Sequence, residues 1–201
     1  MRQALPETGV SRETGERLAV YLALLAEWNP RINLVAPAGI EEWRLRHVED
    51  SAQLRPLLPE RGPFADLGSG AGLPGLVLAA VAGEEWHMVE SDQRKCAFLR
   101  EAARRMGLAN VAIHAMRIEA ARLPPLRALT ARALAPLARL LPHAHRLLAP
   151  DGVAILPKGR SAERELTAAG PTWLMRIERF ASRTEPEATI LRLSEIRPAR
   201  D

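Results

Sequence analysis

The spacing of apolar residues divides this chain into a helical beginning and an alternating remainder. Apolar residues recur at steps of three and four from Leu18 to Trp28, which predicts an amphipathic helix that Ser11 opens and Pro30 ends. A second helical region follows over residues 40–58, and a proline- and glycine-containing turn occupies residues 61–63. We therefore expect an N-terminal helical cap over residues 1–60 and a second domain over residues 61–201.

Short apolar runs alternate with helical stretches in that second domain. The runs predict strands over residues 64–67, 85–90, 110–115, 128–133 and 153–157. The stretches between them predict helices over residues 73–82, 92–107, 136–148 and 162–169, and a single helical turn over 117–122. Pro142 predicts a kink or a division within the third of these helices, and Asp151-Gly152 predicts a turn. Strands separated by helices pair in parallel. Two final strands, over 172–180 and 188–193, have no helix between them and predict an antiparallel hairpin at one edge.

The composition favours a globular protein and excludes several other classes. The chain has 201 residues, of which 47% are hydrophobic and 26% are charged, and this balance is typical of a globular protein with a substantial core. The lone cysteine, Cys96, excludes an internal disulfide and a cysteine zinc site. No apolar run approaches the roughly 18 residues that span a membrane, and the first residues lack the apolar segment of a signal peptide. We expect a cytoplasmic protein with no membrane partner.

The positive charge is unevenly distributed. The formal net charge is +4, but residues 1–60 carry 7 basic against 9 acidic residues, whereas residues 91–170 carry 14 against 6. A basic excess in one part of a chain favours a polyanionic partner such as nucleic acid. Solvated, arginine-rich helix faces explain the same excess equally well, since Lys95 and Lys158 are the only lysines.

A glycine-rich stretch follows the first predicted strand and leads into a helix. Alternate glycines permit a positive φ and close approach of a ligand, and a helix N-terminus offers free N–H groups, so we expect a nucleotide-like ligand there. Gly70-x-Gly72-x-x-Gly75, with Glu90 twenty residues on, fits the dinucleotide fingerprint of an NAD-dependent oxidoreductase. That pattern begins three residues beyond the strand end. Asp66-x-Gly68-x-Gly70-x-Gly72 begins at the strand end and resembles the cofactor loop of S-adenosylmethionine-dependent methyltransferases, which we favour.

Flanking motifs narrow the interpretation. In order, they are Trp28-Asn29-x-x-Ile32-Asn33-Leu34-Val35, Arg46-His47-x-x-Asp50-Ser51, the glycine-rich stretch, Glu90-Ser91, Lys95-x-x-Phe98-Leu99, Arg117-Ile118-Glu119, Arg132-Ala133 and Lys158-Gly159. This series resembles the RsmG/GidB family of small-subunit rRNA guanine-N7 methyltransferases. The resemblance implies a Rossmann-like S-adenosylmethionine-dependent methyltransferase fold, with a mostly parallel seven-stranded sheet, an antiparallel terminal hairpin and the helical cap. It also implies methyl transfer to N7 of guanine 527 in bacterial 16S rRNA.

The resemblance also implies site residues. Glu90 would accept hydrogen bonds from the ribose, and Ile118 and Glu119 would flank the adenine. The full set expected at the cofactor is Asp66, Gly68, Gly70, Leu73, Glu90, Ile118, Glu119 and Arg132. The set expected at the substrate RNA is His47, Asp50, Arg132, Lys158 and Arg160. We expect no general base, because guanine N7 carries no proton, and no metal site. We expect a monomer whose partner is 16S rRNA or the small ribosomal subunit. The remaining alternatives are a non-enzymatic RNA-binding protein on a methyltransferase scaffold and a methyltransferase that acts on a small molecule or protein, which the basic middle of the chain disfavours.

Overall fold

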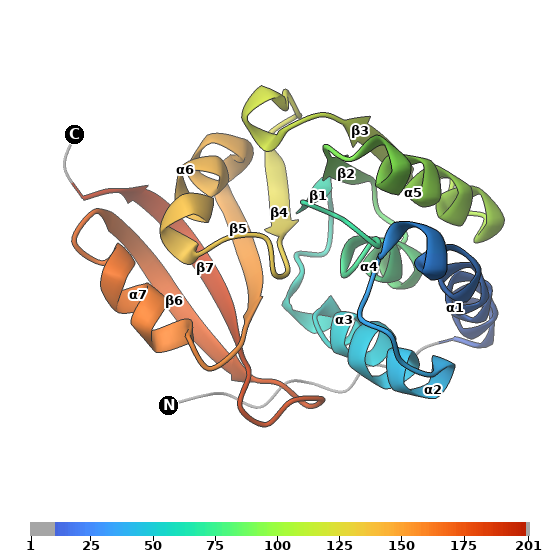
Figure 1. Cartoon of the computed structure of the whole chain (residues 1–201). Helices are drawn as coiled ribbons and strands as arrows, with labels where there is room; N and C mark the ends of the chain where they lie inside the picture. The colour runs from blue at the N-terminus through green and yellow to red at the C-terminus, as the bar shows by residue number, and fades with distance from the viewer. Residues whose placement is uncertain (1–10, 200–201) are drawn as a thin grey trace.

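A seven-stranded sheet forms the centre of the molecule (Figure 1). The computed structural model describes residues 11–199. The strands follow the order β3-β2-β1-β4-β5-β7-β6. Their bounds are β1 Phe64–Leu67, β2 Trp86–Glu90, β3 Val111–Ala115, β4 Leu126–Thr130, β5 Leu148–Lys158, β6 Trp173–Ala181 and β7 Thr189–Pro198. Strands β1 to β5 are parallel, and β7 lies antiparallel between β5 and β6. The predicted parallel sheet and terminal hairpin are confirmed.

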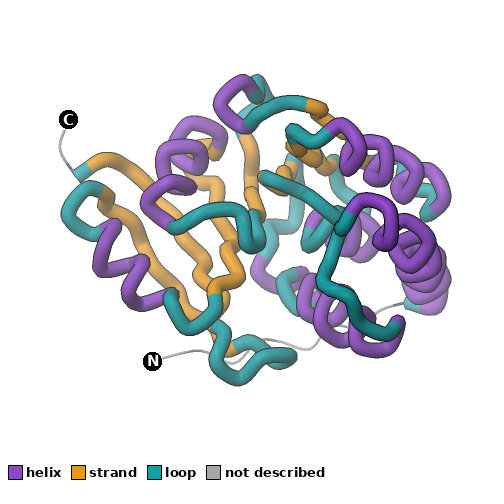
Figure 2. The backbone as a smooth tube through the Cα atoms, in the orientation of Figure 1, coloured by secondary structure: helices purple, strands orange, loops and turns teal. Residues whose placement is uncertain are grey.

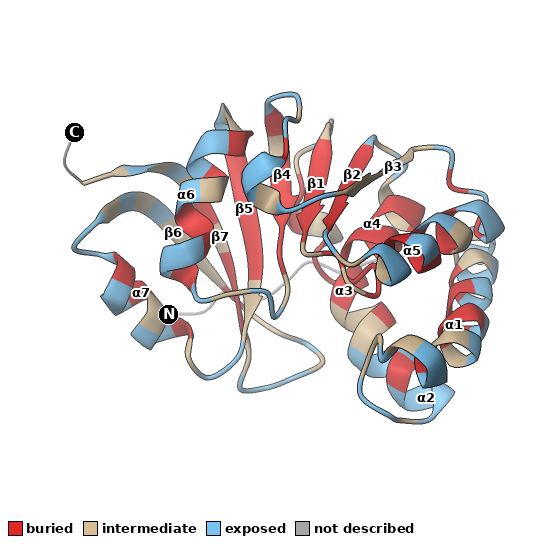
Figure 3. Ribbon diagram, turned by 45° about the horizontal axis from the view of Figure 1, so that its top comes forward, coloured by how far each residue is buried: buried red, intermediate tan, exposed pale blue. Residues whose placement is uncertain are grey.

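Helices cover both faces of the sheet (Figure 2). The longer helices are α1 Arg12–Ile32, α4 Gly75–Ala82, α5 Gln93–Arg105, α6 Leu137–Leu147 and α7 Ala162–Ala169. One apolar core joins α1, α4 and α5 to one face, which includes Phe64 and Trp86. A second core joins α6 and α7 to the other face, which includes Ala65 and Val89. Buried strands therefore lie between two helical layers, as Figure 3 shows.

The N-terminal segment packs on the sheet domain. Ser11 caps α1 by accepting a hydrogen bond from the backbone N–H of Thr14, as the sequence predicts. Buried residues of α1, such as Leu25, share one core with α4 and α5. The division into a cap over 1–60 and a methyltransferase domain over 61–201 stays a prediction. The first ten residues of that cap and the last two of the domain lie outside the described residues.

The second helical region is not one continuous helix. It consists of α2 Ile40–Trp43, a π-helical segment over Arg44–Glu49, α3 Asp50–Ala52 and a 3-10 turn over Arg55–Leu57. The Ser51 hydroxyl donates a hydrogen bond to the carbonyl of His47 at 2.5 Å, which competes with the regular backbone pattern. Pro56 has no backbone N–H with which to extend the helix. Wider π-helical turns are frequent at functional sites.

Strands β4 and β5 differ from the sequence-based expectation. Strand β4 ends at Thr130, so residues 131–136 form a loop. Strand β5 begins at Leu148, and its register against β4 shifts between Leu126 and Ala128. The turn predicted at Asp151-Gly152 is therefore wrong: both residues belong to the irregular start of β5, where Gly152 packs against the backbone of Leu126.

Helix α1 passes through Pro30 and ends at Ile32, where Asn33 takes a left-handed φ of +48°, so the helix end predicted at Pro30 is wrong. The other elements lie near their predicted bounds. Helix α6 runs through Pro142 as one element, and β7 extends five residues beyond its predicted end, to Pro198. Among residues 11–199, no helix has the length and apolar character needed to cross a membrane.

Candidate active site

The glycine-rich loop between β1 and α4 adopts the conformation that its sequence predicts. Gly68, Gly70 and Gly72 have φ values of +66°, +53° and +83°, which non-glycine residues rarely adopt. The backbone N–H of Gly68 donates to the carbonyl of Val89 at 2.8 Å, which attaches the loop to β2. The loop is thus fixed by backbone geometry and presents little side chain to a ligand.

Glu90 ends β2 beside this loop. Its Oε2 accepts a hydrogen bond from the backbone N–H of Gly70 at 2.9 Å, and its Oε1 accepts one from that of Asp92 at 2.8 Å. These two bonds fix the carboxylate, and each oxygen keeps a further lone pair for a hydroxyl donor. Glu90 is therefore oriented as a ribose acceptor would be.

A cavity of about 380 Å³ lies against the glycine loop, and we call it the loop cavity. Six of the eight residues expected at the cofactor line it: Gly68, Gly70, Glu90, Ile118, Glu119 and Arg132. Ile118 and Glu119 belong to a 3-10 turn that follows β3. The ends of β1, β2, β3 and β4 therefore meet at one side of the sheet, where open α/β sheets bind ligands.

The other two expected residues, Asp66 and Leu73, lie beneath the loop and line neither this cavity nor the adjoining one described below. Asp66 is fully buried, and its Oδ1 accepts a hydrogen bond from the Thr130 hydroxyl at 2.7 Å. Its Oδ2 has no hydrogen-bond partner among the described residues. Burial raises the pKa of Asp66 to about 6. Both residues are buried under the glycine loop and can support its conformation. Their direct contact with a ligand stays a prediction.

Tyr21 of α1 supports the same loop from the cap. Its hydroxyl donates a hydrogen bond to the carbonyl of Ala71 at 2.8 Å, and its side chain is fully buried. Burial raises the pKa of Tyr21 above its usual range, so the hydroxyl keeps its proton. The helical spacing places Tyr21 in the core but does not reveal this contact.

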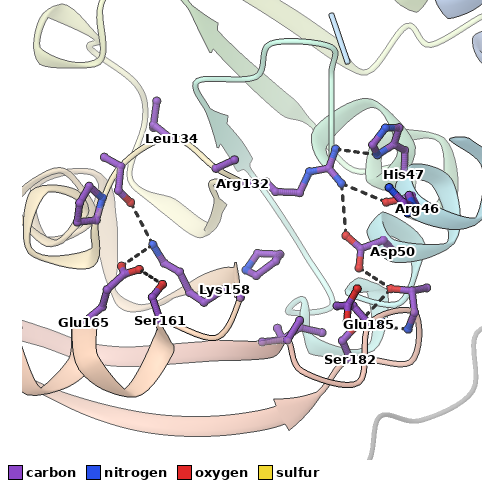
Figure 4. Close-up of a pocket in the computed structure, with 18 of the residues that line it drawn as sticks. Arg46, His47, Asp50, Arg132, Leu134, Lys158, Ser161, Glu165, Ser182 and Glu185 are labelled. Atoms are coloured by element: carbon purple, nitrogen blue, oxygen red, sulfur yellow. Dashed lines mark hydrogen bonds and ion pairs between the residues drawn. The ribbon is translucent and has the colours of Figure 1, made fainter. Parts of the chain in front are cut away.

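A larger cavity of about 950 Å³ adjoins the first, and we call it the outer cavity (Figure 4). The two share the wall formed by Arg132, Ala133 and Leu134. Four of the five residues expected at the RNA line it: His47, Asp50, Arg132 and Lys158. Arg160 does not; it lines a neighbouring hollow and pairs with Glu187.

Arg132 joins the cap to the wall between the cavities. Its guanidinium lies 3.3 Å from Oδ2 of Asp50, 3.4 Å from Nδ1 of His47 and 3.4 Å from the carbonyl of Arg46. Burial, together with the cationic Arg132, holds the pKa of His47 below its usual range. His47 is therefore neutral at neutral pH, and its Nδ1 can accept the bond from Arg132.

Lys158 lies at the opposite side of the outer cavity, with only 10% of its side chain exposed. Its Nζ donates to the carbonyl of Ala135 at 3.0 Å and to Oε2 of Glu165 at 2.9 Å. The backbone N–H of Leu137 donates to the same Glu165 oxygen at 2.7 Å. Lys158 thus anchors the wall segment with two of its three donors. A phosphate contact through the third stays a prediction.

Apolar side chains complete both cavities. Ala133 has a positive φ of +52°, and Leu134 next to it packs on Gly68, where an added Cβ would lie 2.4 Å from Leu134 Cδ1. Six large apolar side chains are exposed among the described residues, and three of them, Leu45, Met116 and Leu134, line the two cavities. Exposed apolar surface beside a few placed polar groups is typical of ligand-binding sites.

Comparison with known proteins identifies the family. The model of the family described as GidB, rRNA small subunit methyltransferase G, matches residues 14–185. The chain belongs to this family. A relative from Granulibacter bethesdensis, named ribosomal RNA small subunit methyltransferase G, is 56% identical and covers 98% of this chain and 92% of its own. A relative of the same name from Rhodospirillum centenum is also 56% identical, over 94% of this chain and 88% of its own.

A solved structure supports the fold. A SAM-dependent methyltransferase from Aquifex aeolicus superposes with a TM-score of 0.59 at 13% identity, over 76% of this chain and 92% of that one. The GidB family membership confirms the resemblance drawn from the motifs, the methyltransferase class and S-adenosylmethionine as cofactor. Neither the family nor these proteins support the oxidoreductase alternative. Residues 11–199 contain no cluster of three or more His, Cys, Asp or Glu side chains that could hold a metal ion.

Proposed function

We propose that this GidB family member transfers the methyl group of S-adenosylmethionine to N7 of guanine 527 in 16S rRNA. The observation that supports this most is the pair of adjoining cavities that share Arg132 and Leu134. One cavity carries the glycine loop and an oriented carboxylate. The other is large enough for a base with part of its backbone and is lined by His47, Asp50 and Lys158. Methyl transfer requires the two ligands to meet, and the shared wall gives them a place to do so.

S-adenosylmethionine fits the residues of the loop cavity. Gly68 and Gly70 have the open conformations that allow close approach, and the Glu90 carboxylate is fixed with lone pairs to spare. We assign the ribose to Glu90 and the adenine to the turn that carries Ile118 and Glu119. When bound, the cofactor supplies a methyl group on a positively charged sulfur.

The guanine belongs in the outer cavity. A base within folded RNA must leave its stack to enter such a pocket. We assign its recognition to His47, Asp50 and Arg132, and contact with the RNA backbone to Lys158 and Arg160. Lys158 and Arg160 belong to the stretch of basic excess over residues 91–170, which favours a phosphate-bearing substrate.

No general base is needed for this reaction. The bound cofactor would supply an electrophilic methyl group to the N7 lone pair and would keep the electron pair of the broken bond. No proton leaves N7. The residues of this chain therefore act by holding N7 in line with the methyl group. A neutral His47 can hydrogen-bond to the base, and the Asp50 carboxylate offsets the charge of Arg132 beside the cation that develops on guanine.

The proposal includes a monomeric enzyme that carries both cavities. The proposal includes cytoplasmic action on 16S rRNA or the small ribosomal subunit. It also retains a cap over 1–60 as one wall of the RNA site and a methyltransferase domain over 61–201.

The test is transfer of a labelled methyl group. Small subunits and naked 16S rRNA from cells that lack this protein are incubated with the purified chain and labelled S-adenosylmethionine, and the modified base is mapped. We expect one label at N7 of guanine 527. A label at another position would refute the assigned substrate.

Two further measurements separate the alternatives. Calorimetry is expected to show binding of S-adenosylhomocysteine and none of NAD; the reverse result would support the oxidoreductase. RNA binding without any transferred label would instead indicate an inactive methyltransferase scaffold.

A further inference from the structure

A buried glutamine connects the cap to the C-terminal hairpin behind the outer cavity. Gln53 is only 2% exposed. Its Nε2 donates to Oδ1 of Asp50 at 2.7 Å and lies 3.2 Å from the hydroxyls of Ser182 and Thr184. Its Oε1 accepts the backbone N–H of Arg183 at 2.8 Å. One amide thus joins two segments about 130 positions apart in the sequence.

Three of the four partners of Gln53 line the outer cavity, although Gln53 itself does not. Asp50, Ser182 and Thr184 belong to the cavity wall, and Figure 4 shows the hairpin turn beside Asp50. Oδ1 of Asp50 also accepts the Thr184 hydroxyl at 2.7 Å, while its Oδ2 faces Arg132 at 3.3 Å. A continuous chain of polar contacts therefore runs from the β6–β7 turn through Asp50 to the wall between the cavities.

We propose that Gln53 is a positioning residue for methyl transfer. It fixes one oxygen of Asp50 so that the other holds Arg132 at the shared wall, and it attaches the β6–β7 turn that closes the outer cavity. This inference rests on the proposed function, because it assumes that the guanine binds in that cavity.

The chemistry of this position calls for an amide. The side chain must donate to a carboxylate and accept from a backbone N–H at the same time, and a neutral amide does both. An ionised carboxylate in its place would have no proton to donate and would repel Asp50. An apolar side chain would leave both Asp50 and the Arg183 N–H short of a partner.

The effect on the reaction follows from geometry. Displacing a reacting group by about 1 Å can lower a rate about 100-fold, even when the changed residue is remote from the chemistry. Gln53 contacts Asp50 directly and is linked to Arg132 only through Asp50. Its loss should therefore lower kcat on the RNA substrate and leave the cofactor's own loop undisturbed.

The decisive variant is Gln53→Glu. At neutral and higher pH we expect kcat on small subunits to fall about 10- to 100-fold, with S-adenosylhomocysteine affinity within about twofold of the native value. As the pH is lowered, the introduced carboxyl group and Asp50 come to share a proton. That proton restores a donor, so the activity of the variant relative to the native enzyme should rise.

Three other variants complete the experiment. Gln53→Met keeps the size of the side chain but gains no proton, so its loss should be the same at every pH. Thr184→Val removes the second donor to Asp50 Oδ1 at a partly exposed turn, and should lower kcat with less risk to folding. Gln93→Glu makes the same charge change at an exposed position outside both cavities and should behave as native.

The outcomes are distinguishable. Native kcat in Gln53→Glu and Thr184→Val, or equal losses in Gln53→Glu and Gln53→Met at every pH, would overturn the positioning role. The native chain is assayed in parallel at each pH. If it transfers no label to the small subunit, the proposed function fails and this inference fails with it. If it transfers label and the Gln53 variants match it, only the inference about Gln53 is rejected.

Discussion

The loop cavity and the outer cavity meet at one wall but are assembled in different ways. The loop cavity is formed by the successive ends of β1, β2, β3 and β4, within residues 68–134. The outer cavity takes its walls from the cap, the loop after β4, the end of β5 and the β6–β7 turn, within residues 45–190. Under the proposed function, binding of the cofactor would depend on local backbone geometry, whereas binding of the guanine would depend on how distant segments pack together.

Gly68→Asp is the substitution that should separate the two cavities most strongly. The residue has a φ of +66°, and an added Cβ would lie 2.4 Å from Leu134 Cδ1, so a side chain would both strain the backbone and fill the loop cavity. We expect S-adenosylhomocysteine affinity, measured by calorimetry, to fall about 100-fold, because the new carboxylate would occupy the ligand's space in the loop cavity beside Glu90. RNA affinity should change little.

Gly83→Asp is the matched control. Gly83 also has a positive φ, +74°, but nothing lies within 4 Å of an added Cβ at the end of α4. It therefore shares the backbone strain without the obstruction. Equal losses of cofactor affinity in both variants would show that strain alone, and not occupation of the cavity, explains the result.

Arg132→Ala should affect both cavities, because this side chain belongs to their common wall. Its removal leaves Asp50 and His47 without their cationic partner. We expect kcat to fall about 100-fold, the size of effect that follows from lost positioning at a reacting centre, with a smaller loss of cofactor affinity. Arg139→Ala, an exposed position on α6, serves as control. A loss confined to cofactor affinity would place Arg132 in the loop cavity alone.

The same contrast explains which site residues could be predicted from the sequence alone. The glycines and Glu90 were predictable because a strand, a glycine turn and an acid at the next strand end fix their relation within about 25 residues. Arg132 followed from its place at the end of a predicted strand together with the match of Arg132-Ala133 to the family motif. Gln53 and Tyr21 gave no such signal: one is a polar residue in a helical stretch, the other an apolar position of an amphipathic helix. Their roles depend on partners, Arg183 and Ala71, that only the folded chain brings near.

Tyr21→Phe tests whether the cap contributes to the loop cavity. The change removes one hydroxyl and leaves the buried carbonyl of Ala71 without its donor. An unsatisfied buried acceptor costs about 1–3 kcal/mol. We expect a loss of that order in unfolding free energy, measured by denaturant titration, and about a tenfold or smaller loss of S-adenosylhomocysteine affinity. Unchanged values in both measurements would mean that the cap packs on the loop without supporting it.

Lys158→Ala should have the smallest effect on ligand binding and tests the assignment of RNA to the outer cavity. The ammonium is mostly buried and already binds Glu165 and the Ala135 carbonyl, so at most one donor reaches a phosphate. One lost phosphate contact lowers the slope of log affinity against log salt by about 0.7 to 0.9. We expect RNA affinity to fall severalfold with that reduced slope, while S-adenosylhomocysteine affinity stays near native. Arg164→Ala removes the same charge at an exposed position on α7 and should leave the slope unchanged. If Lys158→Ala instead lowers kcat with an unaltered salt slope, Lys158 contributes by anchoring the wall between the cavities. Its positive charge would then stabilise the protein and would not contact the RNA.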